Sequence, residues 1–106
     1  MKVIWSDFAA ISLYDIYKYY EEVAGKNVAQ RIKSRIFSAT RQLKRYPESG
    51  RIEPSLKLLG ENHRYLVEGN YKIIYRKVPE GILIADVFDT RQDPVKMSAL
   101  KVKPRR

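Results

Sequence analysis

The first half of the chain repeats apolar residues every three or four positions, the spacing of one helix face. The first stripe predicts a helix that Ser6 caps and Gly25 ends. A second stripe predicts another helix, capped by Asn27 and stopped by Pro47. A short apolar run, Lys2 to Trp5, predicts a strand ahead of both. The two stripes are Ala9, Leu13, Ile16, Tyr17, Tyr20 and Ala24, then Val28, Ile32, Ile36, Ala39, Leu43 and Tyr46.

The second half reads as strands separated by tight turns. Strands are predicted near 63–68, 71–78 and 82–89. Gly69-Asn70 is a two-residue hairpin signal, since both residues accept positive φ, and Pro79-Glu80-Gly81 supplies the next turn. Short turns make neighbouring strands antiparallel. We therefore expect a small α+β domain of order β-α-α-β-β-β, mainly antiparallel, with a helical hairpin on one face of the sheet.

The sequence leaves two features of this fold undecided: how residues 48–62 pack, and which face of the sheet is exposed. Residues 48–62 read as a loop, which Leu56, Leu58 and Leu59 are expected to fix to the core. The other face of the sheet can be open, with strand residues alternating between core and groove. In the middle strand Tyr71, Ile73, Tyr75 and Lys77 share one side, and Lys72, Ile74 and Arg76 the other. Periodicity does not decide which side faces solvent.

Positive charge is concentrated in two blocks. The formal net charge is +9; residues 28–60 carry eight Lys or Arg against two Asp or Glu, and residues 98–106 carry four against none. Residues 1–27 and 61–97 are close to balance. Such blocks indicate an anionic partner, either a polyanion or an acidic protein.

The composition limits the class of protein. A chain of 106 residues forms one domain, which we expect over 1–97 with a flexible basic tail over 98–106. No apolar run approaches the roughly 20 residues that span a bilayer, and no signal-peptide pattern opens the chain. The chain has no cysteine and one histidine, which argues against a metal site and fits a cytoplasmic location. We expect no cofactor.

Two motifs together resemble a known family. Residues 63–94 read HRYLVEGNYKIIYRKVPEGILIADVFDTRQDP, and a Pro-x-x-Gly-Arg loop spans 47–51. With the two preceding helices, they resemble the RelE/ParE superfamily of toxins from type II toxin–antitoxin systems over about residues 2–97. The resemblance implies a cognate acidic antitoxin. The ending Val87-Phe88-Asp89-Thr90-Arg91-Gln92-Asp93 looks more like the ParE branch, whose members inhibit DNA gyrase.

Several residues are candidates for contact with the target. The resemblance indicates Arg64 as a phosphate clamp, or else as a partner of a loop carboxylate, and Arg51 as a target contact or a fold-stabilising residue. Arg91 follows the last strand, where RelE-like nucleases often carry a catalytic residue. Target binding is therefore assigned to Arg51, Arg64, Lys72, Arg76 and Arg91.

Acid–base candidates for an mRNA-cleaving enzyme are poor. His63 titrates near neutral pH, but a surface hydrogen bond explains it better. Asp89, with an ordinary pKa of about 4, is a poor base for a ribose hydroxyl. Tyr71 and Tyr75 could stack on bases, but we favour core positions for them, as for Trp5. The catalytic residues stay unknown, and the weak candidates are Arg64, Arg91, His63 and Asp89.

Three functions remain. The favoured one is a ParE-like toxin that binds and inhibits gyrase; the alternatives are a RelE-like ribosome-dependent mRNA endonuclease and a non-toxic relative that only binds an antitoxin. The resemblance alone does not decide whether the chain is an enzyme.

Overall fold

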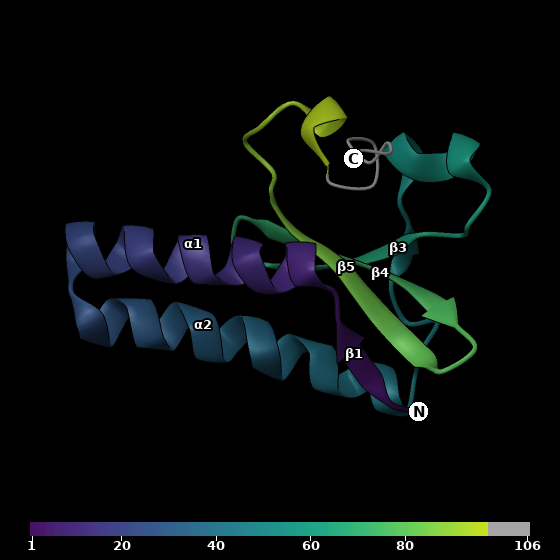
Figure 1. Cartoon of the computed structure of the whole chain (residues 1–106), viewed down its shortest axis with the longest axis horizontal. Helices are drawn as coiled ribbons and strands as arrows, with labels where there is room; N and C mark the ends of the chain where they lie inside the picture. Colours follow the sequence, from purple (N-terminus) through teal and green to yellow (C-terminus); the bar gives the residue numbers. More distant parts are fainter. Residues whose placement is uncertain (98–106) are drawn as a thin grey trace.

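The computed structural model describes residues 1–97, and the basic tail expected over 98–106 lies outside them. The chain forms an α+β fold with a helical hairpin and one five-stranded sheet (Figure 1). The helices are α1 (Asp7–Ala24) and α2 (Lys26–Thr40), and short 3-10 segments are η1 (Arg41–Lys44), η2 (Pro54–Leu59) and η3 (Pro94–Lys96). The strands are β1 (Val3–Trp5), β2 (Arg51–Ile52), β3 (Arg64–Glu68), β4 (Tyr71–Val78) and β5 (Gly81–Asp89).

The sheet has the order β1-β5-β4-β3-β2. Strand β1 runs parallel to β5 at one edge, and all other pairs are antiparallel. The three strands predicted in the second half are confirmed. Strand β2 was not predicted: two residues of the expected loop pair with β3, Arg51 opposite Tyr65 and Ile52 opposite Arg64.

The ends of the helices follow local chemistry. The Ser6 hydroxyl accepts a hydrogen bond from the Ala9 amide at 3.0 Å, as predicted for an N-cap. Gly25, with φ of 94°, ends α1 and also precedes α2 directly. The predicted Asn27 cap is therefore wrong, because Asn27 lies inside the first turn of α2. Helix α2 also ends earlier than predicted: its α-helical part stops at Thr40, and Tyr46 is exposed.

The main core lies between the hairpin and one face of the sheet. Tyr71, Ile73 and Tyr75 of β4 point into it, which settles the face that the sequence left open. Leu13 and Ile36 meet them from the two helices, and the further members are Ala9, Leu43, Ile82, Ile84 and Val87. Tyr71 and Tyr75 are thus core residues, as favoured, and Trp5 packs against the same cluster.

A smaller cluster covers part of the opposite face. Leu56 of η2 and Met97, just after η3, pack there with Ile74 and Phe88. In Figure 1, η2 and η3 accordingly lie apart from the two helices. Only Leu56 fixes the 48–62 segment to the core as expected. Leu58 is fully exposed and Leu59 is 40% exposed, so that part of the prediction is wrong.

No helix within residues 1–97 is long and apolar enough to cross a membrane.

Candidate functional site

The end of β5 holds an arginine in a fixed position. Arg91 donates from Nε to Asp89 Oδ1 at 2.9 Å and from Nη2 to Oδ2 at 2.7 Å, while its amide also donates to Oδ1 at 2.9 Å. These bonds from Arg91 lower the pKa of the Asp89 carboxyl and raise that of the guanidinium. The Arg91 side chain is still 61% exposed. The strand end therefore presents an oriented cation to solvent.

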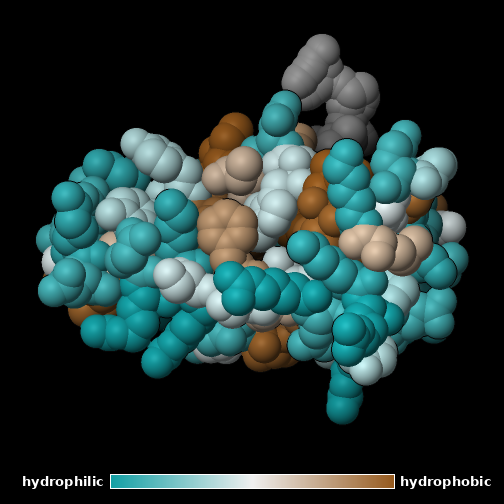
Figure 2. All heavy atoms as spheres, turned by 90° about the horizontal axis from the view of Figure 1, so that it is seen from below, coloured by the Kyte–Doolittle hydropathy of each residue, from teal (hydrophilic) through white to brown (hydrophobic). Residues whose placement is uncertain are grey.

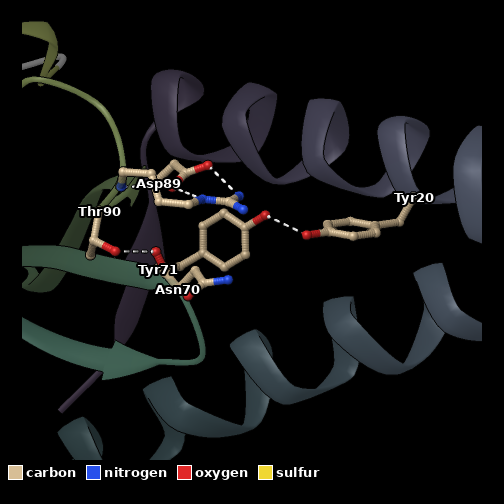
Figure 3. Close-up of polar contacts among 6 residues, drawn as sticks. Tyr20, Asn70, Tyr71, Asp89 and Thr90 are labelled. Atoms are coloured by element: carbon tan, nitrogen blue, oxygen red, sulfur yellow. Dashed lines mark hydrogen bonds and ion pairs between the residues drawn. The ribbon is translucent and has the colours of Figure 1, made fainter.

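Neighbouring side chains fix this strand end to the rest of the fold. Thr90 donates from its hydroxyl to the carbonyl of Asn70, in the β3–β4 turn, at 2.9 Å (Figure 3). Tyr71 donates to the Tyr20 hydroxyl of α1 at 3.5 Å. Burial, together with this bond from Tyr71 to Tyr20, raises the pKa of Tyr71 well above its usual range. Tyr71 is therefore a neutral hydroxyl at physiological pH.

A cleft of about 610 Å³ separates α1 from this strand end. Its walls combine aromatic side chains, such as Phe8, Tyr19 and Phe88, with charged ones of both signs. Ser12 donates to Asp86 Oδ1 across the cleft at 3.3 Å. The remaining lining residues are Asp15, Ile16, Tyr71, Val87, Asp89, Arg91, Gln92 and Lys96. The cleft is open and mixed in character, which suits a protein segment better than a small apolar ligand.

Two of the expected target-binding cations make contacts within the fold. Lys72 Nζ lies 2.8 Å from Glu53 Oε1 and 4.3 Å from the centroid of the Tyr65 ring. The Glu53 side chain is fully buried. Burial acts to raise the pKa of Glu53, but hydrogen bonds from Lys72 and the Ser55 amide outweigh it, so the pKa lies below its usual range. Arg76 pairs more loosely, with Nε at 3.9 Å from Glu61 Oε1.

Arg64 holds the Pro-x-x-Gly-Arg loop in place. Its Nη1 donates to the carbonyl oxygens of Gly50 at 2.8 Å and Glu48 at 3.4 Å. The structural partner of Arg64 is thus loop backbone and not a loop carboxylate, which was the alternative to the phosphate-clamp role. The Gly50 amide in turn donates to the Tyr75 hydroxyl at 2.9 Å. Arg51, next in the loop, is exposed on β2.

His63 is buried, so the expectation of a surface hydrogen bond is wrong. The residue is 3% exposed, and Nδ1 has no hydrogen-bond partner among residues 1–97. Its Nε2 lies 3.8 Å from Glu61 Oε1. Burial lowers the pKa of His63, because the neutral ring is favoured where water is excluded. The structure thus does not bring His63 together with Asp89 and Arg91 in one exposed site.

No group of three or more His, Cys, Asp or Glu side chains in the described part of the chain is arranged to hold a metal ion.

Most of the chain matches one family of toxins. A model described as the ParE toxin of the type II toxin–antitoxin system parDE covers residues 3–94. The chain belongs to this ParE family. It is also similar to a solved structure described as the chromosomal ParDE toxin–antitoxin system from P. aeruginosa, with a TM-score of 0.69 and 20% identity over 84% of this chain and 95% of that one. At that identity the similarity supports the fold alone. No curated protein sequence matches.

A second surface of this ParE-family chain lies between its two helices, next to the end of β1. This hairpin groove, of about 600 Å³, is lined by Trp5, Ala10, Leu13, Tyr14, Tyr17, Lys33 and Phe37. The rings of Trp5 and Phe37 pack with centroids 5.0 Å apart, and Lys33 lies 5.5 Å above the Tyr17 ring. The groove is therefore aromatic with one cation at its edge.

The sequence did not reveal this groove, nor the roles of Tyr20 and Glu53. Tyr20 belongs to the predicted apolar stripe, and nothing in that stripe shows that its hydroxyl meets Tyr71. The exposed Tyr14 and Phe37 lie outside the two predicted stripes. Their signal was available, since both are large aromatic residues at positions where a helical pattern predicts solvent.

Proposed function

We propose that this ParE-family chain arrests growth by binding DNA gyrase and that a cognate acidic antitoxin neutralises it. The observation that carries the proposal is the Arg91–Asp89 pair at the end of β5. Both oxygens of the carboxylate accept hydrogen bonds from Arg91, and the pKa of Asp89 is lowered. This arrangement presents charge for binding and disfavours proton abstraction.

The other candidates for acid–base chemistry support binding over cleavage. Cleavage of mRNA needs a base for the 2′-hydroxyl and an acid for the leaving oxygen. The ring of His63 is buried, and the pKa of Tyr71 is far above neutral. Glu48 and Glu61 form ion pairs with Lys77 at 3.2 Å and Arg76 at 3.9 Å. Inhibition by a complementary surface needs none of these groups to move a proton.

Arg91 and Arg51 are the cations that we propose for contact with the target. Both are exposed, whereas Arg64 and Lys72 form short bonds inside the fold. The bidentate bond to Asp89 orients the Arg91 guanidinium before any partner arrives, which lowers the entropy cost of binding.

The hairpin groove is the proposed binding site of the antitoxin. An amphipathic helix would place apolar side chains among Trp5, Tyr14 and Phe37, and its carboxylates near Lys33. The α2 side of the molecule is largely hydrophilic (Figure 2). The exposed cations of α2, η1 and the residue after η1 are Lys26, Arg31, Arg35, Arg41, Lys44 and Arg45. These charges favour an acidic segment and explain why a basic toxin would pair with an acidic antitoxin.

The antitoxin binding site is tested with two tyrosines of equal exposure. Tyr14, 61% exposed, lines the groove, and Tyr46, 60% exposed, lies outside it. After co-expression with the proposed acidic antitoxin, Tyr14→Asp should weaken co-purification at least about tenfold, because a charge enters the apolar contact. Tyr46→Asp should leave it unchanged. Equal co-purification of the two variants would rule out the groove as the binding site.

The target contact is tested with Arg91→Ala, with Arg41→Ala on η1 as the control. We expect the Arg91 variant to lose most of its inhibition of gyrase supercoiling and most of its growth arrest. Its thermal midpoint should stay near that of the wild type, because the pair with Asp89 is exposed. Full inhibition by Arg91→Ala would exclude this strand end from the target site.

A further inference from the structure

Segment η2 exposes two leucines although its third leucine is buried. Leu56 is 1% exposed and packs against Ile74, Phe88 and Met97. Leu58 is 102% exposed and Leu59 is 40% exposed. We call these two residues the η2 tip. Single exposed leucines are common on protein surfaces, but two adjacent ones on a short ordered segment form a local apolar projection.

The η2 tip is fixed from both ends of its segment. Glu53 caps the start, with Oε2 accepting from the Ser55 amide at 3.0 Å and Oε1 from Lys72 at 2.8 Å. The Glu53 amide donates to the His63 carbonyl at 2.8 Å. Gly60, with φ of 69°, closes the end and donates to the Lys57 carbonyl at 3.1 Å. The leucines therefore project from a rigid support and not from a loose loop.

The Leu58 side chain contributes nothing to the fold that a polar side chain would not. A side chain as exposed as Leu58 buries no area against its own chain, so no hydrophobic free energy of folding depends on it. In a pocket of a partner the same side chain would be fully buried. Complete burial of one leucine strengthens association by about 10- to 100-fold, and a rigid support reduces the entropy lost on docking.

We propose that the η2 tip inserts into an apolar pocket of the target protein whose rim carries carboxylates. The inference rests on the proposed function, in which the target is a protein. Two observations select this occupant. The tip is flanked by the exposed Lys57, so a carboxylate on the rim of the pocket complements it. In addition, η2 adjoins the chain that follows Arg91, because Leu56 and Met97 share one apolar cluster.

The same contacts argue against the other possible occupants. The hairpin groove lies between the helices, whereas η2 packs on the opposite face of the sheet. An antitoxin helix in the groove thus leaves the η2 tip uncovered. A second copy of this chain would bring Lys57 against a molecule that itself carries a formal net charge of +9.

The test compares Leu58→Asp and Leu58→Ala with Val67→Asp in the full chain. Val67 is a matched control, since it is an apolar residue 62% exposed on β3. Both Leu58 variants should need at least about tenfold more protein for half-inhibition of gyrase supercoiling and should relieve growth arrest. Thermal midpoint and antitoxin co-purification should match those of the wild type, and Val67→Asp should behave as the wild type throughout.

Four results would overturn the inference. Unchanged supercoiling inhibition by both Leu58 variants would remove the tip from the target contact and leave the proposed function standing. A thermal midpoint lowered in both would show that the chain itself covers Leu58. Lost co-purification would assign the tip to the antitoxin, and a dimeric wild type made monomeric by Leu58→Asp would assign it to a second copy. Failure of the proposed function is separate, because the wild-type chain itself would then not inhibit gyrase.

Discussion

Substitution of Lys72 by methionine tests whether this lysine stabilises the fold or serves the target. The change removes the ammonium group 2.8 Å from Glu53 Oε1 and keeps most of the side-chain volume. The Glu53 side chain is fully buried, and without Lys72 it would keep its hydrogen bonding to Ser55 but lose its positively charged partner. A buried charge that loses its partner costs about 3–5 kcal/mol.

The lower end of that range applies here. Lys72 is 23% exposed, so water reaches the ammonium end of the pair. We expect Lys72→Met to lower the free energy of unfolding by about 3 kcal/mol. For a domain of this size that corresponds to a fall in thermal midpoint of roughly 12–24 °C.

The assay is denaturant and thermal unfolding of four proteins followed by circular dichroism. Lys72→Met is compared with Glu53→Gln, with the double variant, and with Lys77→Met. The double variant should recover most of the stability that Lys72→Met loses, because it has no unpaired buried carboxylate. Lys77→Met breaks an exposed pair with Glu48, in which the side chains are 50% and 63% exposed, and should cost under about 1 kcal/mol.

Acidification gives a second test of the same pair. In the wild type the lowered pKa of Glu53 contributes stability above the unfolded carboxyl pKa, and that contribution is lost as pH falls through the folded pKa. In Lys72→Met, burial would raise the pKa, so the folded state would bind a proton first. The difference in free energy of unfolding between Lys72→Met and the wild type should become smaller from pH 7 toward about pH 4. The reasoning would be refuted if Lys72→Met lost no more stability than Lys77→Met and if its difference from the wild type did not become smaller at low pH.

Three further predictions concern single positions. Gly50→Ala would place Cβ 2.6 Å from the Tyr65 carbonyl oxygen and 2.7 Å from the Tyr75 hydroxyl, so unfolding should show a loss of about 2 kcal/mol or more. His63 has a lowered pKa, so wild-type stability should fall as pH falls below about 6.5, and His63→Leu should flatten that part of the unfolding–pH profile. Ser6→Ala should lower the free energy of unfolding by about 1 kcal/mol through loss of the α1 cap, whereas Ser38→Ala on the exposed face of α2 should not.

The regular elements could be predicted because each has a local signal. Helical spacing located both helices, and the Gly69-Asn70 turn located β3 and β4. Strand β2 was missed because two residues carry no periodicity and pair only through the distant Arg64 and Tyr65. The Asn27 cap was predicted wrongly, because Gly25 both ends α1 and occupies the N-cap position of α2, so that α2 already begins at Lys26.

The candidate site likewise contains residues that could be predicted from local sequence and residues whose contacts depend on the tertiary structure. Arg91 and Asp89 are two residues apart, and their place at a strand end is visible in the sequence. The partners of Lys72 and Arg64 depend on tertiary contacts, 19 and 14 residues away along the chain. A sequence pattern identifies a lysine or arginine as a cation. It does not show whether that cation already binds a buried glutamate or a backbone carbonyl of the same chain. The exposure of Leu58 could not be predicted for the same reason. The sequence does not distinguish the three leucines of the segment, and only the tertiary structure shows which one packs against the sheet.

The central claim, inhibition of gyrase by binding, is tested most directly by supplying the purified full-length chain to two reactions in parallel. One contains gyrase with relaxed plasmid, and the other contains ribosomes translating a defined mRNA. The account predicts that supercoiling is inhibited and the mRNA stays intact. Cuts at codon positions in the ribosomal A site, with supercoiling unaffected, would contradict it and favour a ribosome-dependent nuclease.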